Sequence, residues 1–278
     1  MEARQIEEHR LVELERNDKE AHALQEADEY NKALETMEVS LHLRKELFGD
    51  ESCQFWDACP VVGQLCNTMA MTHLQQEDLD GCLELLRKAE ILTERSDLHK
   101  AVTFNNLACY YRHRGQLRHA LKYLHRALKI EGKLQLTQNE ADTHLNLCAI
   151  LSELEQHRSA LDHARSALIL LQENLLSGAI GGNPRHSPPD IVNGDIRYTV
   201  APDQRVRPPV QSIAVLGVAY YNAGVELEFL GQTEQSRSSY RKGLDVGATR
   251  LGPNHFIMKI LRNSYDMATE GRRCIRRS

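Results

Sequence analysis

The histidines and cysteines are the side chains of this sequence that could hold a metal ion or serve a catalytic step. His113, His119 and His125 recur at intervals of six, which does not place three side chains on one helix face. His144 and His163 are expected to be packed or surface residues. The seven cysteines include no C-x-x-C pair, and the zinc-protease, phosphate-loop and serine-hydrolase motifs are missing. The sequence therefore predicts no catalytic residues, no metal site and no cofactor, and it favours a protein that is not an enzyme.

The composition restricts the fold and the cellular compartment. The 278 residues are 41% hydrophobic and only 5% aromatic, which favours helices in one or two domains. The chain begins Met1-Glu2-Ala3-Arg4, without the apolar stretch of a signal peptide. Its longest apolar run, near Ile213, is far shorter than the ~20 residues that span a bilayer. We expect a cytoplasmic protein with reduced cysteines and no membrane contact.

The formal net charge of −5 averages over segments of opposite sign. Residues 1–50 carry 14 acidic and 7 basic side chains, whereas residues 101–134 carry seven Lys or Arg and one acid, Glu131. A slightly acidic protein with one basic band is a poor candidate for binding nucleic acid. The charge pattern instead predicts a protein partner with an acidic surface.

A repeated hydrophobic pattern indicates which elements position these residues. From Ala101 to Leu134, apolar residues recur every three or four positions on both sides of Gly115. Two amphipathic helices joined by a tight turn explain this pattern, with small residues where the helices cross. The unit resembles the tetratricopeptide repeat. The residue at the start of the second helix recurs in five copies, at Ala33, Cys82, Ala120, Ala160 and Ser236.

Two stretches and the long spacing between copies refine the resemblance. Thr103-Phe-Asn-Asn-Leu-Ala108 and Leu251-Gly-Pro-Asn-His255 are similar to the kinesin light chain type of array. The resemblance implies an all-α solenoid of about five helix-turn-helix repeats, interrupted by one insert and closed by a C-terminal capping helix that starts near Phe256. The expected segments are a charged helical N-terminal extension (1–16), units 1–4 (17–177), a Pro/Gly-rich irregular insert (178–210), unit 5 with the capping helix (211–271) and an Arg-rich tail (272–278).

The insert contains six of the eight prolines, and these exclude a hidden helix pair. Within it, residues 191–200 alternate between apolar and polar around Asn193-Gly194, which is the pattern of a two-residue β-hairpin. Two interpretations remain open. The segment is either a flexible surface loop with transient turns, or a hairpin that docks on the array or on a partner.

By the resemblance, the first helices line a concave groove, and the positions one and two before the signature Leu can face it. Asparagine recurs at these positions, and its amide can pair with the backbone of an extended peptide. The alternative is that some of these side chains cap or bridge adjacent helices. The predicted peptide-binding groove comprises Asn67, Asn105, Asn106, Arg112, Asn146, Tyr221 and Asn222. The cations with which chaperone-binding repeats hold a terminal carboxylate are missing, so that class of adaptor is not favoured.

The basic band contains a second candidate surface. Arg118, Lys122 and Arg126 recur every four residues on the second helix of the third unit, and Lys129 continues the series. This basic docking patch could meet an acidic surface such as a tubulin tail, or it could be a solvated helix face.

The sequence thus predicts a non-enzymatic adaptor or scaffold that holds a partner's peptide segment in its groove. The alternatives are a structural component of a large microtubule-based or ciliary assembly, docking through its outer charged faces, and a regulatory subunit of an enzyme. The first alternative implies a cytoskeletal or ciliary location. The first repeat is weak, with Asn17 and Glu20 where large apolar residues are usual. It is expected to be a cap or to be completed by a neighbouring protein.

Overall fold

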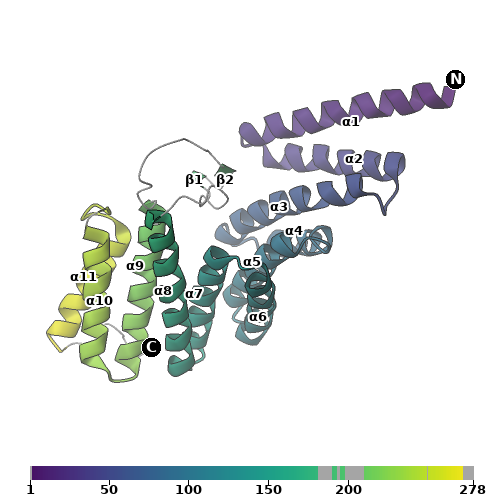
Figure 1. The fold of residues 1–278 in the computed structure, drawn as a ribbon. Coiled ribbons are helices and arrows are strands. Elements are labelled where there is room, and N and C mark those ends of the chain that lie inside the picture. Colours follow the sequence, from purple (N-terminus) through teal and green to yellow (C-terminus); the bar gives the residue numbers. More distant parts are fainter. Residues whose placement is uncertain (1, 181–189, 193–194, 198–209, 249, 272–278) are drawn as a thin grey trace. The chain divides into compact units, whose positions relative to one another are not determined.

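The computed structural model describes residues 2–180, 190–192, 195–197, 210–248 and 250–271. Nearly all of them are helical (Figure 1). The helices are α1 (Glu2–Glu26), α2 (Tyr30–Phe48), α3 (Cys53–Gln75), α4 (Leu79–Leu92), α5 (Asp97–His113), α6 (Leu117–Leu134), α7 (Thr137–Glu153), α8 (His157–Ile180), α9 (Val210–Phe229), α10 (Thr233–Ala248) and α11 (Phe256–Thr269). The predicted Arg-rich tail and most of the predicted insert lie outside the described residues.

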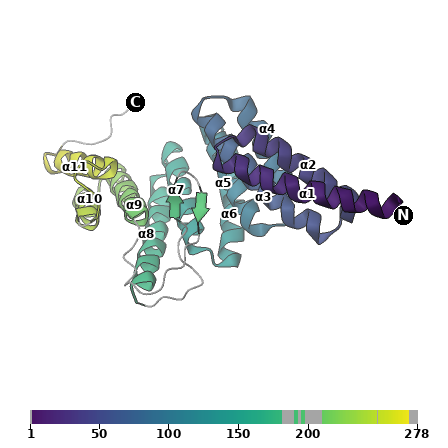
Figure 2. The same cartoon turned by 90° about the horizontal axis from the view of Figure 1, so that it is seen from above.

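The chain forms two compact units, residues 1–130 and 131–278, so the boundary falls inside α6. In the first unit, α1 packs on α2, α2 on α3, and α3 on both α4 and α5. Figure 2 shows α1 and α2 side by side from a second direction. In the second unit, α7 packs on α8, α8 on α9, and α9 on both α10 and α11. The predicted fold class, an all-α tetratricopeptide-type array of about five helix pairs with a last helix, is confirmed.

Small side chains lie where the helices of a pair cross. The five residues predicted to start the second helices are each 0% exposed. Around them, Leu, Phe and Tyr side chains form separate core clusters within each unit. The low aromatic content of the chain follows from this arrangement, because a close helix crossing accommodates Ala, Cys or Ser and excludes rings.

Each helix pair folds back through a turn that contains one residue in the left-handed region. Gly115 and Gly231 have φ angles of 69° and 74°, which glycine adopts at little cost. Glu77 and Glu155 take the same place in their pairs with φ angles of 63° and 58°. Gly271 has a φ of 71° directly after α11. The residue after the last described helix therefore has the same left-handed backbone geometry as the turns within the helix pairs.

Two segments depart from simple helix pairs. α1 is a single helix that covers both the predicted extension and the first helix of the first repeat. In the insert, β1 (Asp190–Val192) and β2 (Asp195–Arg197) pair antiparallel, with Ile191 opposite Ile196. The antiparallel pairing of these two segments is the pairing that the alternating pattern predicts for a hairpin.

Candidate functional site

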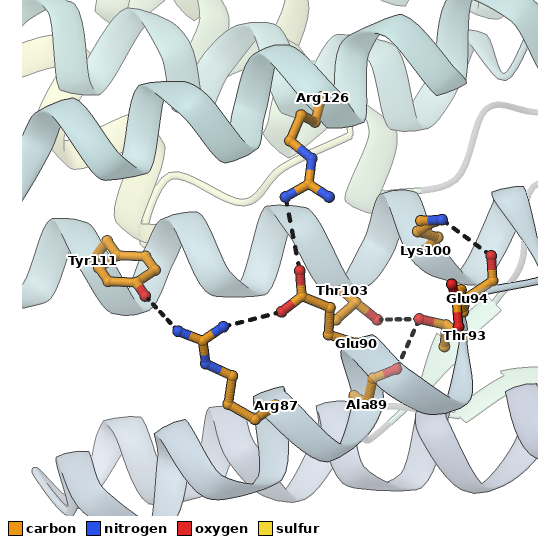
Figure 3. Close-up of polar contacts among 9 residues, drawn as sticks. All are labelled: Arg87, Ala89, Glu90, Thr93, Glu94, Lys100, Thr103, Tyr111 and Arg126. Atoms are coloured by element: carbon orange, nitrogen blue, oxygen red, sulfur yellow. Dashed lines mark hydrogen bonds and ion pairs between the residues drawn. The ribbon is translucent and has the colours of Figure 1, made fainter.

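The predicted groove asparagines differ in whether their side-chain amides already form hydrogen bonds within the fold. Asn67 on α3 is buried, and its Nδ2 donates to Thr103 Oγ1 on α5 at 2.9 Å. Thr103 Oγ1 also lies 3.2 Å from Thr93 Oγ1, which donates to the Ala89 carbonyl (Figure 3). Asn67 therefore bridges two helices of the first unit, which is the alternative role that the sequence left open.

Asn106 on α5 and Asn222 on α9 are half-buried, and neither amide has a hydrogen-bond partner among the described residues. Asn105 is half-buried, and its Nδ2 reaches the Ala101 carbonyl in its own helix at 3.5 Å. Asn146 on α7 is half-buried as well, and it takes part in further interactions. Of the predicted groove asparagines, Asn106 and Asn222 are thus the two whose amides form no hydrogen bond among the described residues.

The other two predicted groove residues make contacts within the array. Arg112 near the end of α5 is exposed and takes part in further interactions. Tyr221 on α9 is half-buried, and its ring lies 6.2 Å from that of Tyr240. Tyr221 therefore contributes to the core of the second unit as well as to its surface.

α3 presents a continuous exposed stripe. Its exposed side chains after Gln54 recur at intervals of three and four residues, which places them on one face of the helix. Only one of them, Asp57, carries a charge. The stripe consists of Asp57, Val61, Gln64, Thr68, Thr72 and Gln75. Beyond Asp57 and Val61 the stripe is polar and uncharged, and such side chains can pair with a peptide backbone.

The predicted basic docking patch on α6 contains one cation that the fold holds in place. The guanidinium of Arg126 lies 3.9 Å from the centre of the Phe104 ring. It also lies 3.7 Å from Glu90 Oε1 (Figure 3). Arg87 also pairs with Glu90, and it donates to the Tyr111 hydroxyl at 3.3 Å. Arg126 is therefore anchored against α4 and α5.

The remaining cations of the patch are different. Arg118, Lys122 and Lys129 are exposed and have no ion pair among the described residues. Beside them, the rings of His119, Tyr111 and Tyr123 form a stack, with neighbouring centroids 5.5 Å apart. This ring stack joins residues of α5 and α6, and the sequence did not reveal it because the partners lie eight and twelve positions apart.

Two close contacts between titratable side chains lie in the second unit. His144 and His163 approach each other with their Nδ1 atoms 2.8 Å apart, and burial lowers the pKa of His144 to about 4. His157 stacks on Phe229 and contacts the buried carboxylate of Glu226 at 2.8 Å. Within the described part of the chain, no three His, Cys, Asp or Glu side chains gather as a metal site would require.

The buried cysteines are poor nucleophiles. Burial raises the pKa of Cys66 and of Cys82 to about 11, and that of Cys148 to about 12. These thiols stay protonated at neutral pH, and it is the thiolate that reacts.

Among the described helices, not one combines the length and the apolarity that crossing a membrane requires.

Models of sequence families match two parts of the chain. One model of the tetratricopeptide repeat matches residues 64–131, in the region of α3 to α6, and another matches residues 218–246, in α9 and α10. The chain therefore contains tetratricopeptide repeats at residues 64–131 and 218–246. No curated protein sequence matches it.

Several solved structures are similar to this chain in fold. BtubC (BKLC) from P. vanneervenii is similar with a TM-score of 0.60 and 17% identity, over 90% of this chain and 87% of that one. A putative kinesin light chain from Podosopora anserina, with nearly identical TPR-like repeats, gives 0.50 and 12% over 86% and 97%. A Rap protein complexed with Competence and Sporulation Factor gives 0.50 and 16% over 95% and 74%. At these identities, the likeness concerns the fold alone.

Proposed function

We propose that this tetratricopeptide repeat protein is a non-enzymatic adaptor that holds a peptide segment of a partner protein against its first helices. The proposal rests on the burial and hydrogen bonding of Asn106 and Asn222. Both amides are half-buried on a first helix, and neither has a hydrogen-bond partner among the described residues. An amide of this kind offers a donor and an acceptor to a peptide backbone.

The surroundings support the proposal in each unit separately. In the first unit, the exposed stripe of α3 is almost free of charge. In the second unit, Tyr221 lies beside Asn222 and supplies a partly exposed aromatic ring, a residue type enriched in binding interfaces. Arrays of such repeats present extended concave surfaces to their partners. The Rap protein of similar fold is itself in a complex, with Competence and Sporulation Factor.

The test compares partner recovery by variants that keep the fold. Asn106→Ala and Asn222→Ala are each expected to lower recovery of a specific partner at least about tenfold in affinity purification with quantitative mass spectrometry, the effect of losing a well-placed hydrogen bond or two. The matched controls are Asn31→Ala on α2 and Asn263→Ala on α11, which remove exposed amides elsewhere. If all four variants recover the same proteins as the wild type, the asparagines do not hold the partner.

A second candidate function rests on the unpaired cations Arg118, Lys122 and Lys129. Three exposed basic side chains that form no ion pair among the described residues are suited to an acidic surface. On this second proposal, the protein is a structural component of a larger assembly, such as a microtubule-based or ciliary one, and docks through α6. A cytoskeletal location would follow from that role, whereas an adaptor needs only a cytoplasmic partner.

A further inference from the structure

The first repeat differs from the others in how its first helix packs. α3 packs directly against α5, α7 against α9, and α9 against α11. α1 and α3 both lie within the described residues, and they do not pack against each other. α2 lies between them (Figure 1) and packs on both. The place that a neighbouring first helix takes elsewhere in the array is therefore open over α2.

This opening is a groove of about 590 Å³ lined by α1, α2 and α3. Its apolar lining includes Ala21, Leu41 and Val62, which are buried, and Val61, which is 53% exposed. The groove therefore has a buried apolar floor and one exposed apolar side chain on its α3 wall. The groove begins where the exposed stripe of α3 begins.

The charges around the groove favour a cationic occupant. Arg44 is held by Asp18 through two contacts of 3.1 and 2.6 Å, so its charge is already compensated. Asp57 on the opposite wall is exposed and has no ion pair among the described residues. The surrounding residues 1–50 carry twice as many acidic as basic side chains. In the described lining, Asp57 is therefore the carboxylate whose charge is not compensated.

The groove also contains a polar atom that the fold leaves without a partner. Ser40 is 3% exposed, lines the groove, and its Oγ finds no hydrogen-bond partner among the described residues. A buried hydroxyl without a partner costs free energy, and an occupant with a donor or an acceptor at this point would remove that cost. Gln54 on the rim adds a further amide.

We propose that the groove between α1 and α3 binds a basic amphipathic helix from a partner protein. The apolar face of that helix lies on α2, in the place of the missing helix contact, and one of its Lys or Arg side chains pairs with Asp57. A helix fits better than an extended segment because the other first helices of the array have a helical neighbour here. A second copy of this chain is a poor occupant through its own α1, since α1 is itself predominantly acidic. The site does not involve the asparagines. It shares Asp57 and Val61 with the exposed stripe of α3.

Calorimetric titration of the full-length protein with two designed peptides tests the proposal. Both peptides have about 18 residues, or five helical turns, with leucines on one face. One carries lysines on the other face, and the second carries glutamates. We expect the lysine peptide to bind at least about tenfold more tightly than the glutamate peptide. Asp57→Lys and Val61→Asn should each weaken its binding at least about fivefold.

Matched variants outside the groove separate specific docking from general attraction. Glu84→Lys and Ile91→Asn change an exposed acid and an exposed apolar residue on α4, and binding should stay within about twofold of the wild type. Asn106→Ala should bind the lysine peptide normally, which keeps this test independent of the asparagine test.

Three results would overturn the proposal. The first is equal binding of both peptides, and the second is an equal loss of binding in Glu84→Lys and Asp57→Lys. The third is self-association in sedimentation velocity that Val61→Asn abolishes, because a second copy of the chain would then occupy the groove.

Discussion

At the scale of single residues, packing decides whether a polar side chain is used inside the fold or remains available to a partner. Asn67 and Asn106 lie on equivalent first helices, but Asn67 is buried against Thr103 whereas Asn106 has no partner among the described residues. Asparagine recurs in the sequence at these positions, and the repeat pattern predicted that they lie on the first helices. It could not predict this difference, because Asn67 and Thr103 lie 36 positions apart and their approach depends on how α3 packs on α5.

His144 provides a prediction about acid stability. Burial and, second, the neighbouring His163 lower the pKa of His144 from 6.5 to about 4. Between these pH values the unfolded chain binds a proton that the folded chain does not, so this contribution destabilises the fold as the pH falls below about 6.5 and is absent above it. Between pH 7 and pH 5, the wild type should lose about 2 kcal/mol more stability than His144→Gln.

Urea unfolding followed by circular dichroism at both pH values measures this difference. His22→Gln, which removes an exposed imidazole on α1, is the control and should follow the wild type. Parallel pH curves for His144→Gln and the wild type would contradict a buried, neutral imidazole at this position.

At the scale of helices and turns, the repeat frame could be predicted because it depends on residue size. Small residues recur where helices cross, and all five are fully buried. The turns were only partly predictable. Gly115 and Gly231 indicated two of them, but Glu77 and Glu155 adopt the same left-handed geometry without being glycine, and the surrounding helix packing imposes it on them.

Two glycines inside helices should respond oppositely to the same substitution. A Cβ atom on Gly224 would lie 2.3 Å from Cε1 of Tyr240, which is fully buried and whose hydroxyl donates to Glu228. The ring cannot move easily, so Gly224→Ala should destabilise the protein by about 2 kcal/mol or more. A Cβ on Gly132 would meet no atom within 4 Å, so Gly132→Ala should stabilise α6 by about 0.5–1 kcal/mol.

The two midpoints of urea unfolding, each compared with the wild type, check this pair of predictions. A stability of Gly224→Ala equal to that of the wild type would mean that Tyr240 does not pack against α9 as described.

At the scale of the whole molecule, the charge distribution separates the two proposed functions. Reversal of Arg118 and Lys122 to Glu places two acids on an exposed face of α6 and should leave folding unchanged within about 0.5 kcal/mol. If the protein docks on an acidic surface, the double reversal should lower the affinity at least about tenfold, and added salt should weaken wild-type binding but not the residual binding of the variant.

Co-sedimentation with microtubules and pull-down of recovered partners, each at two salt concentrations, measure this effect. The control is Lys32→Glu, which reverses a cation on α2 that pairs with Glu29. An adaptor that works through its first helices should keep its partner in the double reversal, so an unchanged interaction would argue against docking through α6.

The distribution of aromatic residues gives this molecule a built-in optical probe. Trp56 is its single tryptophan; it lies in the first unit with the Arg95 guanidinium 4.0 Å from its ring. Its emission therefore reports on residues 1–130 alone, whereas the far-ultraviolet signal sums the helices of both units. Melting curves recorded in the two ways coincide only if the units unfold together. Without any added label, the chain can thus reveal whether its two halves behave as one thermodynamic body.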